Sequence, residues 1–211
     1  MAKSKGAESN GWDWYHRSVP ALVAGLMALG VGGCNTLGLS RSPESDEDMG
    51  NQYVDSGFRG DMLVSRMKPV RLRLQNDWQA APSGTLHPNA DLEAYNPDQN
   101  LFLVVLGESR AAVGPGNLEE QASNYLQILK GGFSQIIANQ SRTDVNQVDG
   151  FPAVQYEVRG EVAQRPVAYL HTTVEMGEEY YQVVVWTPDD LRAANADAMR
   201  SVVQEFSAAQ Q

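Results

Sequence analysis

The sequence of 211 residues predicts an α+β fold in which two main helices cover a central, mainly antiparallel sheet. Residues 91–108 and 145–187 contain successive apolar runs separated by short turns, which is typical of strands joined as hairpins. The residues after Asn117 and after Thr187 instead place apolar side chains at helical spacing. Because the apolar side of a sheet or a helix has to be buried, we expect the two helices to pack on the faces of the sheet.

The first expected strand covers residues 70–74, where apolar and charged side chains alternate. Arg71 and Arg73 would share its solvated side, and Arg66 and Lys68 precede them. These four basic residues form either the wet face of an edge strand or a patch for an acidic partner.

A hairpin is expected next, from residues 91–95 and 101–108, because residues 96–100 between them are rich in turn formers. Residues 101–106 are apolar at every position. This pattern places the second strand of the hairpin at the centre of a sheet that is covered on two sides.

The first helix is expected to begin after Asn117, because Asn117 and Glu120 have the spacing of a capping box. Gly131 and Gly132 interrupt its apolar stripe, and they either allow close packing against a strand or end the helix. The stripe runs through Leu118, Ala122, Tyr125, Leu126, Leu129, Phe133, Ile136 and Ile137.

The second half of the domain predicts strands at residues 145–148, 153–158, 167–175 and 180–187, with a turn at 176–179. Asp189 and Asp190 then supply the acidic first turn of a second helix. The apolar stripe of this helix contains Leu191, Ala194, Met199, Val202, Val203 and Phe206.

Four segments of this half carry a resemblance to a known family: residues 149–156 (DGFPAVQY), 167–170 (VAYL), 179–187 (EYYQVVVWT) and 202–206 (VVQEF). Over roughly residues 60–208 the chain resembles the PsbP-like/Mog1-like domain, including DcrB-like envelope lipoproteins. The resemblance implies an α/β/α sandwich and an accessory or binding role. The matching residues belong to turns and core, so no metal-binding or partner-binding residue of the family is carried over.

The N-terminal segment, residues 1–33, has the order of a secretory signal: a weakly positive leader, an apolar run and small residues. The apolar run from residue 19 to residue 33 is shorter than the roughly 20 residues of a membrane-spanning helix, which makes a permanent span the poorer interpretation. The run ends in Val31, Gly32, Gly33 and Cys34, which resembles a bacterial lipobox. In such signals the cysteine thiol receives a diacylglycerol and the peptide is cut before it. The alternative is an ordinary signal peptide in which Cys34 is a small apolar residue.

Localisation follows from this anchor. Residues 34–52 are expected to form the lipidated cysteine and an acidic, flexible tether, and residues 53–211 a single domain. The acidic residues 44–48 lack the spacing and turn glycine of a calcium loop. Asn35 is not the aspartate that resembles an inner-membrane retention signal, so we expect the periplasmic face of the outer membrane in a Gram-negative host. A Gram-positive surface is the other possibility.

The charge of the chain excludes some partners. It has 16 basic and 26 acidic residues, and removal of residues 1–33 would leave 13 and 24. Such an excess of acidic residues is the wrong sign for binding nucleic acid. Membrane attachment is therefore expected through the lipid anchor, together with an envelope protein partner of unknown identity. Because Cys34 is the only cysteine, the domain has no disulfide.

The sequence contains no recognisable catalytic, metal or cofactor set. His87 and His171 lie far apart and have no cysteine partner, which makes a poor zinc site. No serine lies in a nucleophile elbow, and residues 112–117 lack the lysine of a phosphate-binding loop. We therefore expect a non-enzymatic, lipid-anchored accessory protein of the cell envelope that binds a protein partner or small ligand. The alternative is an envelope hydrolase, which would require a pocket that gathers His171 or His87 with a carboxylate.

Overall fold

The computed structural model describes residues 56–59, 61–75 and 77–209. Its strands form two sheets. The small sheet has the order β1 (Ser56–Arg59), β2 (Met62–Ser65), β3 (Val70–Arg73) and β12 (Phe206–Ala208). The large sheet has the order β4 (Gln79–Ala80), β5 (Leu92–Asn96), β6 (Leu101–Ser109), β11 (Glu179–Pro188), β10 (Arg165–Met176), β9 (Phe151–Val162) and β7 (Gln135–Arg142), and β8 (Gln147–Val148) pairs with β9.

The helices are α2 (Arg110–Val113), α3 (Leu118–Gly131) and α4 (Arg192–Gln204), the last preceded by the 3₁₀ turn η1 (Asp189–Leu191). All pairings between described strands are antiparallel. The predicted α+β class with two main helices is therefore confirmed. Asn117 and Glu120 form the predicted capping box at the start of α3.

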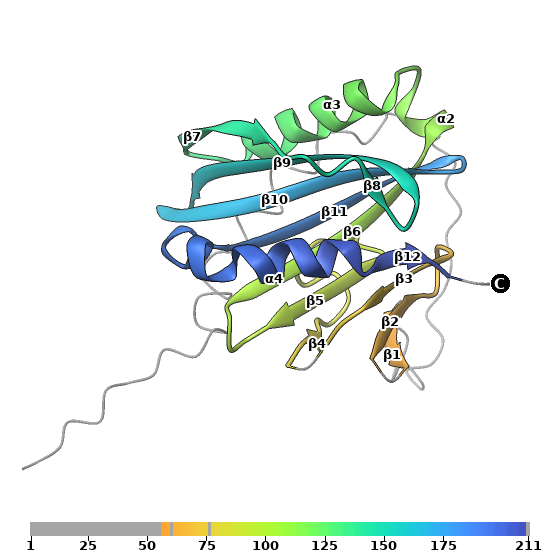
Figure 1. Ribbon diagram of the computed structural model, residues 1–211, viewed down its shortest axis with the longest axis horizontal. Helices are drawn as coiled ribbons and strands as arrows, with labels where there is room; N and C mark the ends of the chain where they lie inside the picture. The colour runs from red at the N-terminus through yellow and green to blue at the C-terminus, as the bar shows by residue number, and fades with distance from the viewer. Residues whose placement is uncertain (1–55, 60, 76, 210–211) are drawn as a thin grey trace, which may run out of the picture.

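The large sheet has two buried faces, which neighbouring residues of β10 identify because successive strand residues point to opposite sides. Tyr169 packs in a core with Leu126 and Leu129 of α3, whereas Leu170 packs in a separate core with Met199 and Val203 of α4. We call these the α3 face and the α4 face. Figure 1 shows α3 beside β9 and α4 in front of β11, roughly parallel to β10. The predicted α/β/α sandwich is confirmed.

The small sheet adds to the core of the α4 face. Leu72 of β3 and Phe206 of β12 lie in the same cluster as Leu170, and the rings of Phe206 and Tyr181 are 5.5 Å apart. Two expectations are corrected here. The strand at residues 70–74 is present but lies between β2 and β12, so it is not an edge strand. Phe206 was expected in the last helix, but α4 ends at Gln204 and the following backbone pairs with β3.

The stripe predicted to continue through Phe133, Ile136 and Ile137 as a helix is wrong beyond Gly131, where α3 ends. Residues Gln135–Arg142 form β7 and pair with β9. The glycine pair therefore ends the helix, which was one of the two interpretations. Ile136 and Ile137 remain 47% and 38% exposed.

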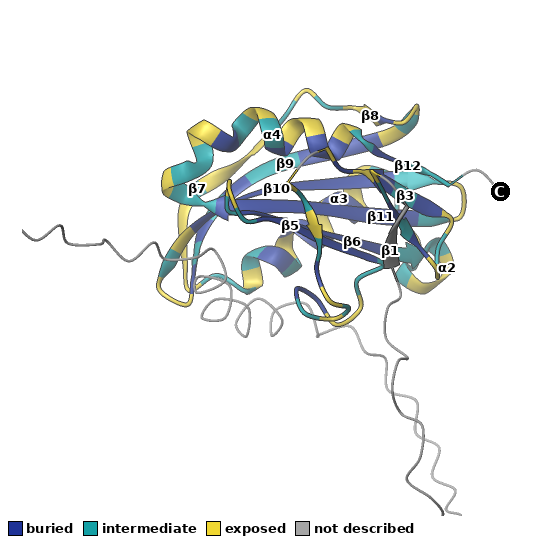
Figure 2. Ribbon diagram, turned by 90° about the horizontal axis from the view of Figure 1, so that it is seen from below, coloured by how far each residue is buried: buried dark blue, intermediate teal, exposed yellow. Residues whose placement is uncertain are grey.

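The predicted hairpins are confirmed. β9, β10 and β11 are longer than expected, whereas the strand expected at residues 145–148 is only the two-residue β8. β5 pairs with β6, and β9, β10 and β11 form a continuous meander. β6 lies between β5 and β11 and is buried on both faces over residues 101–106, as predicted. Figure 2 shows these buried central strands between helices whose outer sides are exposed.

The predicted signal peptide, residues 1–33, and the tether with Cys34, residues 34–52, lie outside the described residues. Within the described part of the chain, no helix has both the length and the apolar character needed to cross a membrane.

Candidate binding sites

An open groove of about 640 Å³ lies at the junction of α4, the end of β3 and the β5–β6 turn. Two side chains hold the turn in place. Asn96 Oδ1 accepts the backbone N–H groups of Asp98 and Gln99, each at 3.1 Å, and Asn195 Nδ2 of α4 donates to the carbonyl of Gln99 at 2.7 Å. The residues that line the groove are Arg73, Gln75, Asp77, Trp78, Asn96, Asp98, Gln99, Ala198, Ser201, Val202 and Glu205.

The charge of this groove is negative. Three carboxylates, those of Asp77, Asp98 and Glu205, line it against the single guanidinium of Arg73. That guanidinium is itself 3.4 Å from the carboxylate of Asp61. The half-buried Trp78 adds an aromatic surface, and an indole ring with a polar edge suits a partly hydrated interface. The groove therefore favours a cationic or hydroxyl-rich partner over an anionic one.

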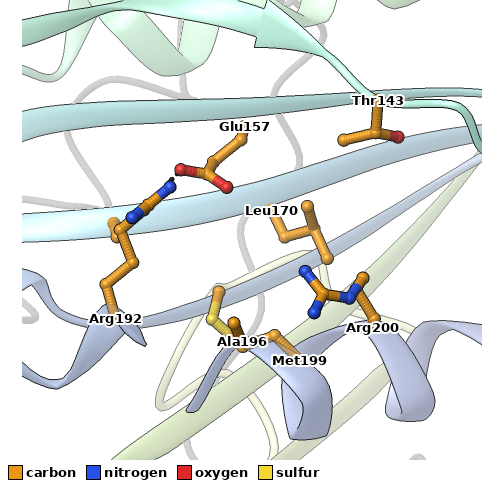
Figure 3. Close-up of a pocket in the computed structure, with 8 residues that line it drawn as sticks. Thr143, Glu157, Leu170, Arg192, Ala196, Met199 and Arg200 are labelled. Carbon is orange, nitrogen blue, oxygen red and sulfur yellow. Dashed lines mark hydrogen bonds and ion pairs between the residues drawn. The ribbon is translucent and has the colours of Figure 1, made fainter. Parts of the chain in front are cut away.

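A second hollow, drawn in Figure 3, lies where α4 crosses β9 and β10 and measures only about 40 Å³. The side chains of Glu157 and Arg192 meet at one end of it, where they form an ion pair, and Leu170 and Met199 lie between the helix and the strands. Asp189 and Arg159 form a second, bidentate ion pair nearby, with both N–O distances 2.6 Å. Hydrogen bonding to Arg159 lowers the pKa of Asp189. These contacts fasten η1 and α4 to β9, and the hollow is a gap in that packing.

The third hollow is a cavity of about 120 Å³ on the α3 face. Its walls come from β6, from α3 and from the loop before β5. His87 Nε2 and Tyr125 Oη, both on lining residues, are buried and have no hydrogen-bond partner. The lining residues are His87, Asn89, Leu106, Gly107, Glu108, Tyr125 and Ile128.

A buried carboxylate that sequence reasoning missed holds the wall that carries His87. Glu93 of β5 is 2% exposed, and its oxygens accept the backbone N–H groups of Thr85, Leu86 and His87 at 3.2, 3.4 and 2.9 Å. Burial raises the pKa of Glu93 to about 7, against the opposing effect of these bonds. The available signal was an acidic residue inside the otherwise apolar pattern of residues 92–95.

His171 lies on the α3 face in a fully buried position. Its Nε2 is 2.8 Å from Gln182 Oε1, which also accepts from Thr173 Oγ1 at 2.6 Å. Because an amide oxygen only accepts, the ring proton lies on Nε2. Burial lowers the pKa of His171 to about 4 although the bond to Gln182 opposes this. Its Nδ1 has no partner, and no carboxylate bonds to the ring.

The four basic residues that precede and occupy β3 do not form a free patch. Lys68 Nζ is 2.8 Å from Glu179, Arg71 Nε donates to Ser207 Oγ at 3.2 Å, and Arg73 pairs with Asp61. The interpretation of an acidic-partner site loses its support, because three of the four side chains already have partners within the chain.

Three large aromatic residues of β11, Tyr180, Tyr181 and Trp186, are all buried in the core and offer no binding surface. No group of three or more metal-ligating side chains occurs among residues 56–59, 61–75 and 77–209. Neither histidine bonds to a serine, and no serine, threonine or cysteine lines the cavity that contains His87.

Comparison with solved structures finds the same architecture in cyanobacterial PsbP (CyanoP) from Synechocystis sp. PCC 6803. The two chains are 12% identical with a TM-score of 0.50, over 84% of this chain and 98% of that one. LpqN, involved in cell envelope biogenesis of Mycobacterium tuberculosis, is 14% identical with a TM-score of 0.41, over 67% and 83% of the two chains. PA94 of Pseudomonas aeruginosa, of unknown function, is 12% identical with a TM-score of 0.45, over 72% and 100%.

No protein-family model and no curated protein matches the sequence. The likeness to CyanoP shows that the chain has the PsbP-like fold, as the resemblance of residues 149–156 and the later segments predicted. At this identity the likeness concerns the fold alone, and the functional argument has to come from the sites.

Proposed function

We propose that this protein is a non-enzymatic, lipid-anchored accessory protein of the cell envelope that binds an envelope protein or a small ligand. The lipobox-like run ending at Cys34 supports the anchor, because acyl chains on that thiol would attach the domain to a membrane. In a Gram-negative host the anchor would hold the domain at the periplasmic face of the outer membrane.

The observation that carries the binding role is the groove of about 640 Å³ beside α4. Its volume lies within the range of ligand-binding clefts, and it is lined by Trp78 and by three carboxylates that have only one arginine among them. The backbone of its rim is fixed by Asn96 and Asn195, so a partner would meet a preformed surface. The net negative lining supports a partner that presents cationic or hydroxyl groups.

Site-specific photocrosslinking in intact cells tests this groove. A photoreactive residue at Gln99, which lines the groove, should capture a reproducible partner, identified by mass spectrometry. The same residue at Gln127, exposed on the outer side of α3, is the matched control and should capture none. Asp98→Lys should weaken capture at Gln99, because it reverses a charge of the lining. Equal capture at both positions, or no capture at Gln99, would contradict the proposed groove.

The lipid anchor is tested by the intact mass of the processed protein. We expect a product that begins at Cys34 and carries acyl chains, and a Cys34→Ala variant that carries none and leaves the membrane fraction. A wild-type product without acyl chains, or with its leader still attached, would overturn the anchor and the localisation together.

One observation favours the alternative of a hydrolase, since His87 and the carboxylate of Glu108 line the same cavity. However, His87 Nδ1 accepts the backbone N–H of Asn89 at 3.2 Å, which leaves the ring proton on Nε2 and removes that nitrogen as a general base. A hydrolase would also need a nucleophile or an activated water, and no serine, threonine or cysteine lines the cavity. Loss of an envelope hydrolytic activity in a His87→Gln variant would reinstate this alternative.

A further inference from the structure

The cavity on the α3 face offers hydrogen-bonding groups that the fold leaves unused. His87 is 5% exposed and Tyr125 is 7% exposed, and both line the cavity with a polar atom that has no partner. Buried polar groups in native proteins are nearly always paired, and an exception calls for a specific explanation such as a bound molecule. Two exceptions that line the same cavity indicate a site that accepts a ligand.

The proton on His87 defines what this site can bind. Because Nδ1 accepts the backbone N–H of Asn89, the unpartnered Nε2 carries the hydrogen and donates. Burial lowers the pKa of His87, so the ring stays neutral near pH 7. A protonated Nε2 does not coordinate a metal ion, and the nitrogen needs an acceptor such as a carbonyl oxygen.

The other polar groups of the cavity also limit which ligand can form hydrogen bonds there. Tyr125 Oη can donate or accept, and the carboxyl group of Glu108 offers acceptors. A carboxylate ligand would be repelled by Glu108, whereas an ammonium ion would leave the His87 N–H without an acceptor. A carboxamide satisfies both sides, because its oxygen accepts from His87 or Tyr125 and its N–H groups donate to Glu108.

The walls of the cavity are fixed by the carboxylates of the buried Glu93 and the half-buried Asp91. Glu93 binds the backbone of residues 85–87, as described above, and Asp91 Oδ2 accepts the N–H of Gly107 at 2.6 Å. A side chain at Gly107 would collide with the Tyr181 ring and approach Asp91. The loop before β5 is thus held against β6, and such preorganisation favours binding of a small molecule.

The volume limits the ligand to a few non-hydrogen atoms. A volume of about 120 Å³ corresponds to the liquid volume of about four waters, which is well below the size of a typical drug-sized ligand site. We infer that this cavity binds the carboxamide group of a small uncharged molecule, between His87, Tyr125 and Glu108. This site is separate from the groove beside α4, so its failure would leave the crosslinking test of the proposed function in place.

The test uses the processed full-length protein, labelled with ¹⁵N, in detergent micelles, with acetamide, acetate and methylammonium as probes. Acetamide should shift the backbone amide signals of Gly107 and Asn89 in a saturable manner, and the two ions should bind at least about fivefold more weakly, the ratio for one neutral hydrogen bond of about 1 kcal/mol. The ¹⁵N shifts of the His87 ring should show a protonated Nε2. No saturable shift, equal binding of all three probes, or a proton on Nδ1 would overturn the inference.

Variants separate binding from folding. Tyr125→Phe removes only a hydroxyl and should weaken acetamide binding about fivefold. Tyr169→Phe removes an equally unpartnered buried hydroxyl that does not line the cavity, and it should leave the affinity unchanged. His87→Asn is the second variant if Tyr125→Phe does not fold, and it should also weaken binding, because the shorter side chain moves the donor back. Unchanged affinity in the folded Tyr125→Phe or His87→Asn variant would overturn the inference.

Discussion

Among the described residues, the buried side-chain polar atoms found without a hydrogen-bond partner number six on the α3 face of the large sheet and none on its α4 face. Gln155 of β9 shows the first pattern, since it accepts from Thr143 at 2.9 Å and donates to Thr172 at 2.8 Å. Asn195 of α4 shows it too, since it donates to Thr187 at 2.8 Å. The unpartnered atoms belong to His87, Tyr125, Tyr169, His171, Gln182 and Trp186.

The unpaired polar groups of the α3 face lower its contribution to stability relative to the α4 face. Each unsatisfied buried polar group costs about 1–3 kcal/mol, so the α3 face is less stable than its apolar packing alone would make it. The α4 face instead has paired buried amides and two ion pairs that join η1 and α4 to β9. Two of the six unpartnered atoms line the cavity, which is where a ligand would offset the cost.

The largest expected effect is on the pH dependence of stability, because the two faces titrate in different ranges. Burial raises the pKa of Glu93 on the α3 face to about 7. A raised carboxyl pKa contributes stability that is present below the unfolded value of about 4.5 and is lost as the pH rises to about 7. Glu93→Gln removes this loss. The free energy of unfolding of the variant minus that of the wild type should therefore rise by roughly 3 kcal/mol between pH 4.5 and pH 7.5. Unfolding in urea at each pH measures it.

The control for this experiment lies on the α4 face. The pKa of Asp189 is lowered by Arg159, so its contribution is present above about pH 4 and is lost only below it. Asp189→Asn should therefore lower stability by a constant amount between pH 4.5 and pH 7.5. His171, whose pKa is lowered to about 4, loses stability as the pH falls from 6.5, but it does so in all three proteins. A constant offset for Glu93→Gln would contradict the burial of a protonated carboxyl group.

The second prediction concerns how each face is fastened to its helix. On the α3 face the Phe133 ring lies against the backbone of Gly160, where a Cβ atom would collide with it. Gly160→Ala should destabilise the domain by about 2 kcal/mol, because the ring has to move out of the core. Gly150→Ala is a poorer control, since Gly150 has a positive φ of 78°. Gly131→Ala is the better one, because a Cβ there meets nothing within 4 Å. Equal losses for Gly160→Ala and Gly131→Ala in urea unfolding would show that the ring contact is unimportant.

The sequence predicted local elements of the fold better than the pairing of distant segments. The hairpins, the capping box at Asn117 and the central position of residues 101–106 are local patterns, and all were predictable. Phe133, Ile136 and Ile137 also fit the helical stripe, but they lie beyond α3, because pairing of β7 with β9 overrides a periodicity that continues by coincidence. The small sheet depends on Phe206 meeting Leu72, which are far apart in the sequence.

The candidate sites were less predictable than the fold. The sequence indicated His87 only as a histidine without a cysteine partner, since its neighbours in the cavity come from β6 and α3. Glu93 gave a weak signal as a charge in an apolar strand. The groove beside α4 joins residues 73–78, 96–99 and 198–205, and no local pattern indicates which of these polar residues meet in space.

The third prediction compares the same substitution at neighbouring residues of β10. Thr172 faces α4 and Thr173 faces α3. Thr172→Val would leave the buried Gln155 Nε2 without an acceptor. Thr173→Val would leave Gln182 Oε1 still bonded to His171. We expect Thr172→Val to cost about 1 kcal/mol more in the free energy of unfolding. Equal costs, or a larger cost at Thr173, would contradict the assignment of the α4 face as the fully paired one.

The smallest expected effect is at Tyr169, whose hydroxyl on the α3 face has no partner. Tyr169→Phe keeps the ring contacts with Phe133 and Trp186, at 5.6 and 6.0 Å between centroids, and removes only the unsatisfied group. It should therefore be neutral or stabilise the domain by up to about 1 kcal/mol. Tyr180→Phe is the matched change, and it should destabilise by about 1 kcal/mol because Tyr180 donates to the carbonyl of Gly116 at 3.3 Å. If urea unfolding shows that both variants lose stability equally, the Tyr169 hydroxyl is paired in solution, and the α3 face then has one unsatisfied buried group fewer.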